Sequence, residues 1–266
     1  MKKIILAALA AFLLVGCRPS HEVAIVAHRG YWNCGQGGQS HNSIASLQAA
    51  QDIKVWGSEF DVTMTADGEM VVFHDWSADG KALCLSNWSD LEGYRLPNGE
   101  RMPTLDEYLT QFEKAGTSMV LELKAHSTPE QERAAVEKSL ELIKQHGLYD
   151  PSRVTFISFS MEACAAYAGL APGFEVQYLG SDVTPAQCKE RGLTGIDYHQ
   201  GCLLDEHPEY VEQAHALGMT VNCWTIDDPD AMKRLIELGV DQITTNCPEA
   251  TREVLKEMKI KELKTK

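Results

Sequence analysis

The feature that most constrains this chain is a repeated alternation of short apolar segments with longer amphipathic ones along almost its whole length. Eight segments are apolar or alternate with period 2 as β-strands do, and they occupy residues 23–27, 59–64, 119–123, 154–157, 175–179, 195–199, 220–225 and 242–245. Helical spacing follows them; Val136, Leu140 and Ile143 fall on one face of a predicted helix. Eight strand–helix units in about 240 residues have the proportions of a (β/α)8 TIM barrel, an α/β fold.

Two stretches depart from the alternation. Residues 75–103 are rich in Gly, Asp, Ser and Trp and indicate neither a clear helix nor a strand, so we expect a small insertion after the second strand that folds over the barrel mouth. The Lys-rich end, residues 256–266, is expected to be a solvated helix face and a frayed tail.

A doubly wound open sheet is the alternative fold, but no Gly-x-Gly-x-x-Gly follows a strand, so a dinucleotide site lacks support.

The first sixteen residues have the pattern of an export signal. Lys2 and Lys3 precede an unbroken apolar run over residues 4–15, which is too short to cross a bilayer of about 30 Å as a helix. The Leu-Val-Gly sequence before Cys17 resembles the bacterial lipobox, which implies removal of residues 1–16 and lipidation of Cys17. An ordinary secretory peptide or a buried N-terminal helix is the alternative. We expect residues 17–266 to form one exported barrel domain, anchored by lipid to the periplasmic or cell-surface face of a bacterial membrane.

Charge and cysteine content exclude other classes. The chain of 266 residues has 24 Lys and Arg against 38 Asp and Glu, so it lacks the basic excess that neutralises a nucleic-acid backbone. A small phosphate ligand needs only a few local cations, so the acidic net charge does not exclude it. Seven cysteines follow Cys17 without any Cys-x-x-Cys pair, which disfavours a zinc finger and a complete disulfide framework.

Charged and histidine side chains gather where the first three predicted strands end, at the edge where TIM barrels carry their active sites. These residues are His28, Arg29, Glu59, Asp61, His74, Glu122 and Lys124. Glu59 and Asp61 are two apart on one strand, so both face the same side. Three inward carboxylates repel one another unless a cation lies between them, and an all-oxygen set favours Mg²⁺ or Ca²⁺ over zinc. Each residue alone could have an ordinary structural role. The prediction of a cation site depends on all of them lying together at strand ends.

These residues also carry a family resemblance. Four segments, His28-Arg29-Gly30, Glu59-Phe60-Asp61-Val62, His74-Asp75 and Leu121-Glu122-Leu123-Lys124, resemble the signature of the glycerophosphodiester phosphodiesterase family, and Trp224-Thr225 and residues 245–248 match its later strand ends. The resemblance implies a TIM barrel with an inserted subdomain, one divalent cation (Mg²⁺ or Ca²⁺), and hydrolysis of a small-molecule glycerophosphodiester to glycerol 3-phosphate and an alcohol.

The resemblance also implies a role for each residue. Metal ligands would be Glu59, Asp61 and Glu122. His28 and His74 would be the general acid–base pair, in an order left open. Substrate contacts would be Arg29, Asn42, Lys124 and Trp224. Two positions depart from the family pattern: His41 stands where a carboxylate is usual, which makes it a candidate substrate contact, and Asn246 stands where the last strand usually carries Asp.

Other functions stay open. A phospholipase D-like barrel would cleave a lipid or lysolipid headgroup, and a tethered binding protein would capture glycerophosphodiesters without turnover, although His28 and His74 are hard to explain in a binding protein. A metal-dependent amidohydrolase would carry His-x-His on its first strand, where this chain has His-Arg-Gly.

Overall fold

A closed barrel of parallel strands forms the centre of the molecule. The computed structural model describes residues 21–265. Within them the barrel strands are β1 (Glu22–Ala27), β2 (Gly57–Met64), β6 (Ser118–Leu123), β7 (Val154–Ser158), β8 (Glu175–Tyr178), β9 (Gly195–His199), β10 (Thr220–Trp224) and β11 (Gln242–Thr245). The barrel closes because β1 pairs in parallel with both β11 and β2. The predicted TIM barrel is confirmed, and the open doubly wound sheet is wrong.

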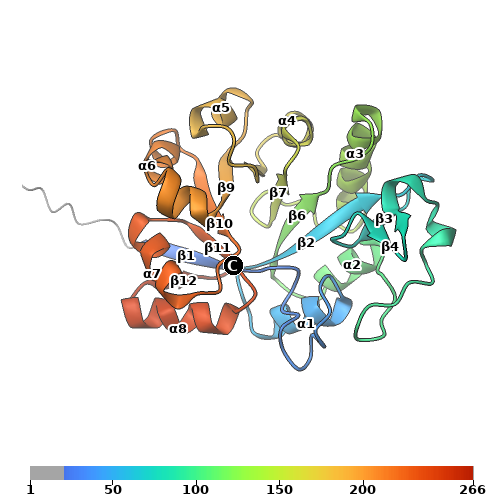
Figure 1. Cartoon of the computed structure of the whole chain (residues 1–266), viewed down its shortest axis with the longest axis horizontal. Helices are drawn as coiled ribbons and strands as arrows, with labels where there is room; N and C mark the ends of the chain where they lie inside the picture. The colour runs from blue at the N-terminus through green and yellow to red at the C-terminus, as the bar shows by residue number, and fades with distance from the viewer. Residues whose placement is uncertain (1–20, 266) are drawn as a thin grey trace, which may run out of the picture.

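A helix follows each barrel strand and covers its outer face (Figure 1). The helices are α1 (Ile44–Asp52), α2 (Leu105–Phe112), α3 (Pro129–Gln145), α4 (Met161–Leu170), α5 (Pro185–Glu190), α6 (Glu209–Ala216), α7 (Pro229–Leu238) and α8 (Pro248–Met258). Local chemistry sets where they begin: the Thr104 side chain accepts from the backbone N–H of Glu107, and Glu107 returns the bond in a capping box. The predicted inward face of α3, with Val136 and Ile143, is fully buried.

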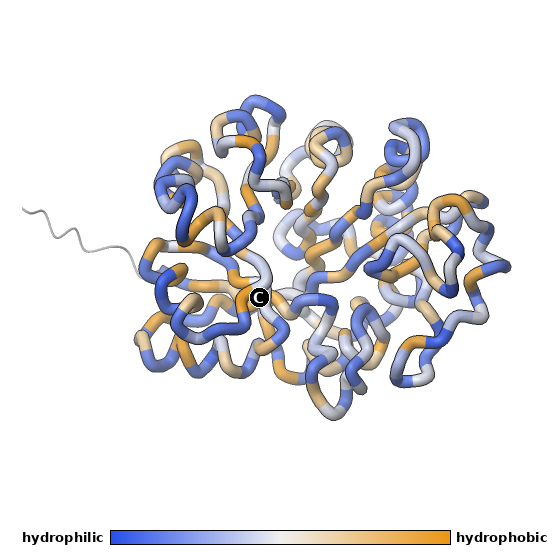
Figure 2. Tube along the Cα trace, viewed as in Figure 1, coloured by the Kyte–Doolittle hydropathy of each residue, from blue (hydrophilic) through white to orange (hydrophobic). Residues whose placement is uncertain are grey.

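Because strand residues alternate with period 2, the side chains of each barrel strand lie in two environments. The main apolar cluster takes alternate residues, such as Phe60 and Val62 of β2 or Leu121 and Leu123 of β6, and packs them against the helices. The intervening residues face the barrel interior. In Figure 2 the strands are largely apolar and the outer loops hydrophilic. The interior is unusually polar for this fold, because it holds the buried side chains Glu59, Asp61, Glu122, Gln177, Asp197, Asn222 and Thr244.

The insertion carries its own small core. β3 (Met70–Val72) runs antiparallel to β2, and beyond it lie a hairpin of β4 (Ser77–Ala78) and β5 (Lys81–Ala82) and the short 3-10 turns η1 (Leu83–Leu85) and η2 (Trp88–Asp90). The expectation that residues 75–103 lack strands is therefore wrong in detail. The insertion and the β3 segment together form this core, whose buried apolar residues are Val71, Phe73, Ala78, Leu83, Leu91, Leu96 and Met102. The insertion borders the first turns of α1 and α3, since a Glu100 carboxylate accepts from the Ile44 N–H and Gln131 donates to the Cys84 carbonyl.

The predicted frayed tail is wrong. α8 ends at Met258, Lys259 takes a left-handed φ of 57°, and the chain returns as β12 (Lys261–Leu263) beside β1. The N-terminal half of β1 has an unpaired edge on the side of β2, because β2 pairs with β1 only from Val26 onward. β12 pairs with residues 22–24 of β1 at this edge. Arg252 holds the strand down through an ion pair with Glu262, Nε to Oε2 at 2.8 Å.

The predictions for residues 1–16 and for Cys17 lie outside the described residues. Within residues 21–265, no helix combines the length and apolarity needed to cross a membrane. The seven cysteines of this part form no disulfide, and five of them are buried. The remaining element, η3 (Cys202–Glu206), is a π-helical turn between β9 and α6.

Candidate active site

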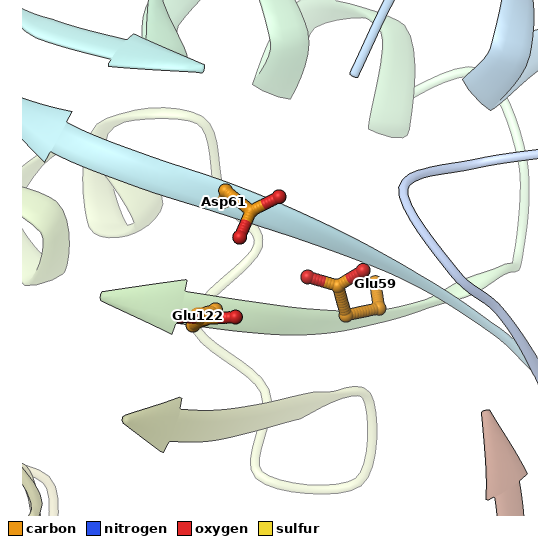
Figure 3. Close-up of side chains that lie close together, drawn as sticks. All are labelled: Glu59, Asp61 and Glu122. Carbon is orange, nitrogen blue, oxygen red and sulfur yellow. The ribbon is translucent and has the colours of Figure 1, made fainter. Parts of the chain in front are cut away.

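Three carboxylates meet inside the barrel near its C-terminal mouth (Figure 3). Glu59 and Asp61 project from the same face of β2, and Glu122 projects from the neighbouring strand β6. Asp61 and Glu122 are register partners in the sheet, so their side chains lie side by side. One oxygen from each residue lies within 4.8 Å of the others. The sequence spacing therefore places the three predicted metal ligands together.

The carboxylates differ strongly in their affinity for protons. Burial, with the neighbouring Asp61, raises the pKa of Glu122 to about 8 and that of Glu59 well above its usual value. Burial also opposes ionisation of Asp61, but Lys124 and Arg29 outweigh it and lower the pKa of Asp61 to about 2. Asp61 is thus the stable anion of the cluster, and the other two acids need further positive charge to ionise beside it.

Two cations flank the cluster as predicted. Lys124 Nζ lies 2.7 Å from Glu122 Oε1 and 3.2 Å from Asp61 Oδ1. Arg29 Nε lies 3.5 Å from Asp61 Oδ2. Burial opposes the charge of Lys124, but Asp61 and Glu122 outweigh it and raise the pKa of the ammonium group. Both cations line the pocket beside the acids, where an anionic group would meet them.

The turn after β1 needs a residue without a side chain. Arg29 has a left-handed φ of 57°, which directs its backbone N–H to Glu59 Oε2 at 2.7 Å. Gly30 follows with φ of 76°, and a Cβ there would lie 2.4 Å from Ser46 Oγ of α1. The Gly30 conformation therefore lets α1 pack close to the loop that carries His28 and Arg29.

Asn42, a predicted substrate contact, lies beside Asp61 and is 1% exposed. Its Nδ2 donates to Asp61 Oδ2 at 2.8 Å, and its Oδ1 accepts from the Asp61 N–H at 3.2 Å. Both ends of the amide are bonded to a predicted metal ligand, so Asn42 orients Asp61.

The two predicted acid–base histidines have different partners. His28 Nδ1 lies 2.8 Å from Asn246 Oδ1, and burial followed by the charge of Arg29 lowers the pKa of His28 to about 4. His74 Nδ1 lies 2.8 Å from the carboxylate oxygen Oδ1 of Asp75. One histidine therefore faces an amide and the other a carboxylate.

His41, the departure noted after the first strand, packs against neighbouring side chains. Its ring centroid lies 4.1 Å from that of Trp32, and its Nδ1 lies 3.4 Å from Arg29 Nη1. Burial and Arg29 lower the pKa of His41. The ring therefore lies between Trp32 and the guanidinium of Arg29.

A pocket of about 180 Å³ opens over the carboxylates. One side is polar and consists of His28, Arg29, Glu59, His74, Glu122 and Lys124, together with Asp197 and Thr244. The other side is apolar and consists of Ile157, Phe159, Leu179 and Trp224. Phe159 is 47% exposed and meets Trp224 edge to face, with ring centroids 5.6 Å apart. The pocket can thus hold a charged phosphate on one side and a carbon skeleton on the other.

Sequence reasoning missed several residues of this site. Asp197 is 1% exposed, lines the pocket, and has an Oδ1 without a hydrogen-bond partner among the described residues; burial and Glu122 raise its pKa well above the usual value. Phe159 was also missed, as was Asp227, which accepts a hydrogen bond from Asn246, the partner of His28. The period-2 position of Asp197 on β9 was the available signal, because it places the side chain inside the barrel.

The donor set suits a hard divalent cation. All three side chains offer carboxylate oxygens, and Glu59 Oε1 is buried without a hydrogen-bond partner in the described part of the chain. Such an orphaned buried oxygen costs free energy unless a cation or another donor satisfies it. Glu59, Asp61 and Glu122 therefore fit a divalent-metal site.

Known proteins share this architecture. The chain is 41% identical to a glycerophosphodiester phosphodiesterase from Parabacteroides distasonis whose crystal structure superposes with a TM-score of 0.86, covering 91% of this chain and 100% of that one. It is also 28% identical over 251 residues to a glycerophosphodiester phosphodiesterase of Caldanaerobacter subterraneus subsp. tengcongensis, which is 86% of this chain and 96% of that protein. A Bacillus subtilis enzyme of the same name is 27% identical over 264 residues, 88% of this chain and 87% of that protein.

Fold, site and relatives together define an enzyme of the phosphoric diester hydrolase class. Residues 28–250 match the model of the glycerophosphoryl diester phosphodiesterase family, and the chain belongs to that family. The matched range begins at His28 and includes all predicted site residues of the barrel.

Proposed function

We propose that the chain hydrolyses glycerophosphodiesters to glycerol 3-phosphate and an alcohol, with one Mg²⁺ or Ca²⁺ ion and two histidines of opposite role. The observation that carries the proposal is the buried cluster of Glu59, Asp61 and Glu122, which lies between Arg29 and Lys124 at the floor of the pocket. A phosphodiester carries one negative charge, and the two cations supply the complementary charge for it.

Glu59, Asp61 and Glu122 would hold the cation. A bound divalent ion polarises a phosphoryl oxygen and offsets the charge that develops during displacement. Arg29 and Lys124 hold the phosphate against the cluster. The apolar side of the pocket, with Phe159 and Trp224, excludes water and contacts the carbon atoms of the substrate.

We assign the base to His28 and the acid to His74. The low pKa of His28 keeps it neutral at pH 7, so it can accept a proton from the attacking oxygen, either of water or of the substrate's own glycerol hydroxyl. That oxygen forms the new bond to phosphorus as the bond to the leaving oxygen breaks. Where the glycerol hydroxyl attacks, water then opens the cyclic phosphate by breaking its bond from phosphorus to that hydroxyl oxygen, which gives glycerol 3-phosphate. His74 gives a proton to the leaving alcohol, and the Asp75 carboxylate balances the charge of the protonated ring.

A panel of glycerophosphodiesters assayed with Mg²⁺, Ca²⁺ and Mn²⁺ tests this proposal, with ³¹P NMR to identify products. We expect glycerol 3-phosphate, loss of turnover in chelator, and loss of at least about 100-fold in His28→Ala or His74→Ala. Full activity in chelator or in either variant would refute the mechanism. A free headgroup with a lipid phosphate or a cyclic lipid phosphate as the final product, and without glycerol 3-phosphate, would instead favour phospholipase D-like cleavage.

We further propose that Cys17 carries the lipid anchor that holds the enzyme at the membrane, on the periplasmic or cell-surface side. The support is the lipobox resemblance of the sequence before Cys17. Cell fractionation tests it: the native chain should stay with membranes and Cys17→Ala should not be lipidated. An intact N-terminus at Met1 in the mature protein would refute it.

A further inference from the structure

His28 takes part in a chain of hydrogen bonds that runs away from the pocket. Its Nδ1 meets Asn246 Oδ1 at 2.8 Å, just after β11. The Asn246 Nδ2 in turn donates to Asp227 Oδ2 at 2.7 Å, just after β10. Asp227, Asn246 and His28 therefore form a continuous series from a carboxylate, through an amide, to an imidazole.

The orientation of the amide is fixed on both sides by the chemistry of its partners. The indole N–H of Trp32 can only donate, and it reaches Asn246 Oδ1 at 2.9 Å, so that atom must be the carbonyl oxygen. The carboxylate of Asp227 can only accept, so the atom facing it must be the NH₂ group. Asp227 is itself held in place, because its Oδ1 accepts from the Asn246 backbone N–H at 2.8 Å and from Thr245 Oγ1 at 3.0 Å.

This orientation decides where the proton of His28 lies. An amide oxygen accepts and cannot donate, so the imidazole nitrogen that faces it, Nδ1, must carry a hydrogen. In the neutral ring the other nitrogen, Nε2, then has a free lone pair. His28 lines the pocket, so Nε2 is the ring nitrogen left for the substrate side.

We propose that Asp227 and Asn246 are positioning residues that hold His28 in its Nδ1–H tautomer, so that Nε2 is the proton acceptor of the reaction. The inference rests on the proposed role of His28 as base. Asn246 places a neutral amide next to the ring, and the Asp227 carboxylate lies one residue further along the series. Arg29, Asp61 and His41 also act on His28 electrostatically. The other charged or titratable groups that line the same pocket are Glu59, His74, Glu122, Lys124 and Asp197.

Asp227→Asn in the otherwise native enzyme tests the inference. The new amide keeps its oxygen on the Asn246 backbone N–H and Thr245 Oγ1, so its NH₂ group faces the NH₂ group of Asn246 and opposes the native orientation, which only the Trp32 indole then supports. An Asn246 amide that turns round presents NH₂ to His28 and favours the wrong tautomer. We expect kcat to fall by about 10- to 100-fold with little change in KM, as for other groups that orient a reacting residue. Nitrogen-15 NMR of labelled His28 should show Nδ1–H in the native enzyme and a loss of that tautomer in the variant. Asp230→Asn, on the exposed first turn of α7, is the matched control and should match the native enzyme.

The exchange variant Asp227→Asn/Asn246→Asp separates positioning from packing. It keeps one amide and one carboxylate in the same space but brings the charge against His28. We expect the acidic limb of the kcat/KM pH profile to move upward by about 1 unit or more, because an adjacent carboxylate favours the protonated ring. This variant also serves if Asp227→Asn fails to fold.

The outcomes distinguish the inference from the function on which it rests. Full activity in His28→Ala would overturn the role of His28 itself. Inactive His28→Ala together with unchanged kcat, tautomer and pH profile in both Asp227 variants would overturn the positioning role alone. A changed tautomer with a matching fall in kcat supports it.

Discussion

Removing divalent cations leaves Glu59, Asp61 and Glu122 facing one another with no ion shared by all three. Their oxygens lie within 4.8 Å, where two ionised carboxylates would repel by about 3 kcal/mol at an effective dielectric constant of about 20, and this repulsion together with burial raises the pKa of Glu59 and Glu122. Lys124 and Arg29 offset part of this repulsion through Asp61. A cation in the cluster would relieve the remainder, so binding should stabilise the folded chain.

The expected size of this effect follows from mass action. A cation at about 100 times its Kd stabilises the folded state by about 2.7 kcal/mol. For a domain of this size that raises Tm by about 5–10 °C. Differential scanning fluorimetry of chelator-treated protein, titrated with Mg²⁺, Ca²⁺ and Mn²⁺, measures the shift for each ion without requiring turnover.

Glu59→Gln is the decisive variant because it removes one charge from the cluster and keeps the shape of the side chain. Its amide oxygen can still accept from the Arg29 N–H. We expect the shift in Tm to fall by more than half, whereas Glu141→Gln on the exposed face of α3 should keep all of it. Equal shifts in Glu59→Gln and native protein, or no shift with any of the three ions, would refute a metal site at this cluster.

Three further outcomes are expected. Phe159→Ala should raise KM about fivefold with kcat nearly unchanged, because it removes roughly 1 kcal/mol of apolar contact at the pocket rim; steady-state kinetics with an unchanged KM would mean that the substrate does not touch this side. Asn42→Gly should lower the free energy of unfolding in urea by about 2–3 kcal/mol, because two hydrogen bonds to Asp61 are lost while Gly tolerates the φ of 56°; a loss below about 1 kcal/mol would contradict this. Burial lowers the pKa of His126 from 6.5 to about 4, so between these two pH values the folded state binds fewer protons than the unfolded chain, and stability should fall as the pH falls from 6.5 to 4. His126→Asn should reduce this dependence of stability on pH, and an equally steep dependence in the variant would assign it to other groups.

Most of the polar side of the pocket was predictable because its residues lie near the ends of strands whose alternation of apolar and polar residues is clear in the sequence. Glu59 and Asp61 share a face through the period-2 geometry of one strand, and parallel strands bring their C-terminal ends to one rim. These rules are local or follow from fold class. They therefore locate the acids, His28 and Lys124 without any knowledge of side-chain packing.

Contacts between distant loops were not predictable in the same way. Asn42 was expected at the substrate, but its left-handed backbone turns the amide toward Asp61, 19 residues away. The short strand β12 has no clear alternation, and it forms only because an edge of β1, more than 230 residues earlier, stays open. Both outcomes depend on how close two separate segments come in space.

The sequence alone determined the barrel, the position of its mouth, the three carboxylates and the two histidines that face them, because hydrophobic period and strand ends are properties of local chain geometry. Only the tertiary structure decided which histidine meets an amide and which meets a carboxylate. That difference arises where the loops after β10 and β11 bring Asp227 and Asn246 to His28, a contact that hydrogen-bond chemistry fixes once the barrel has closed.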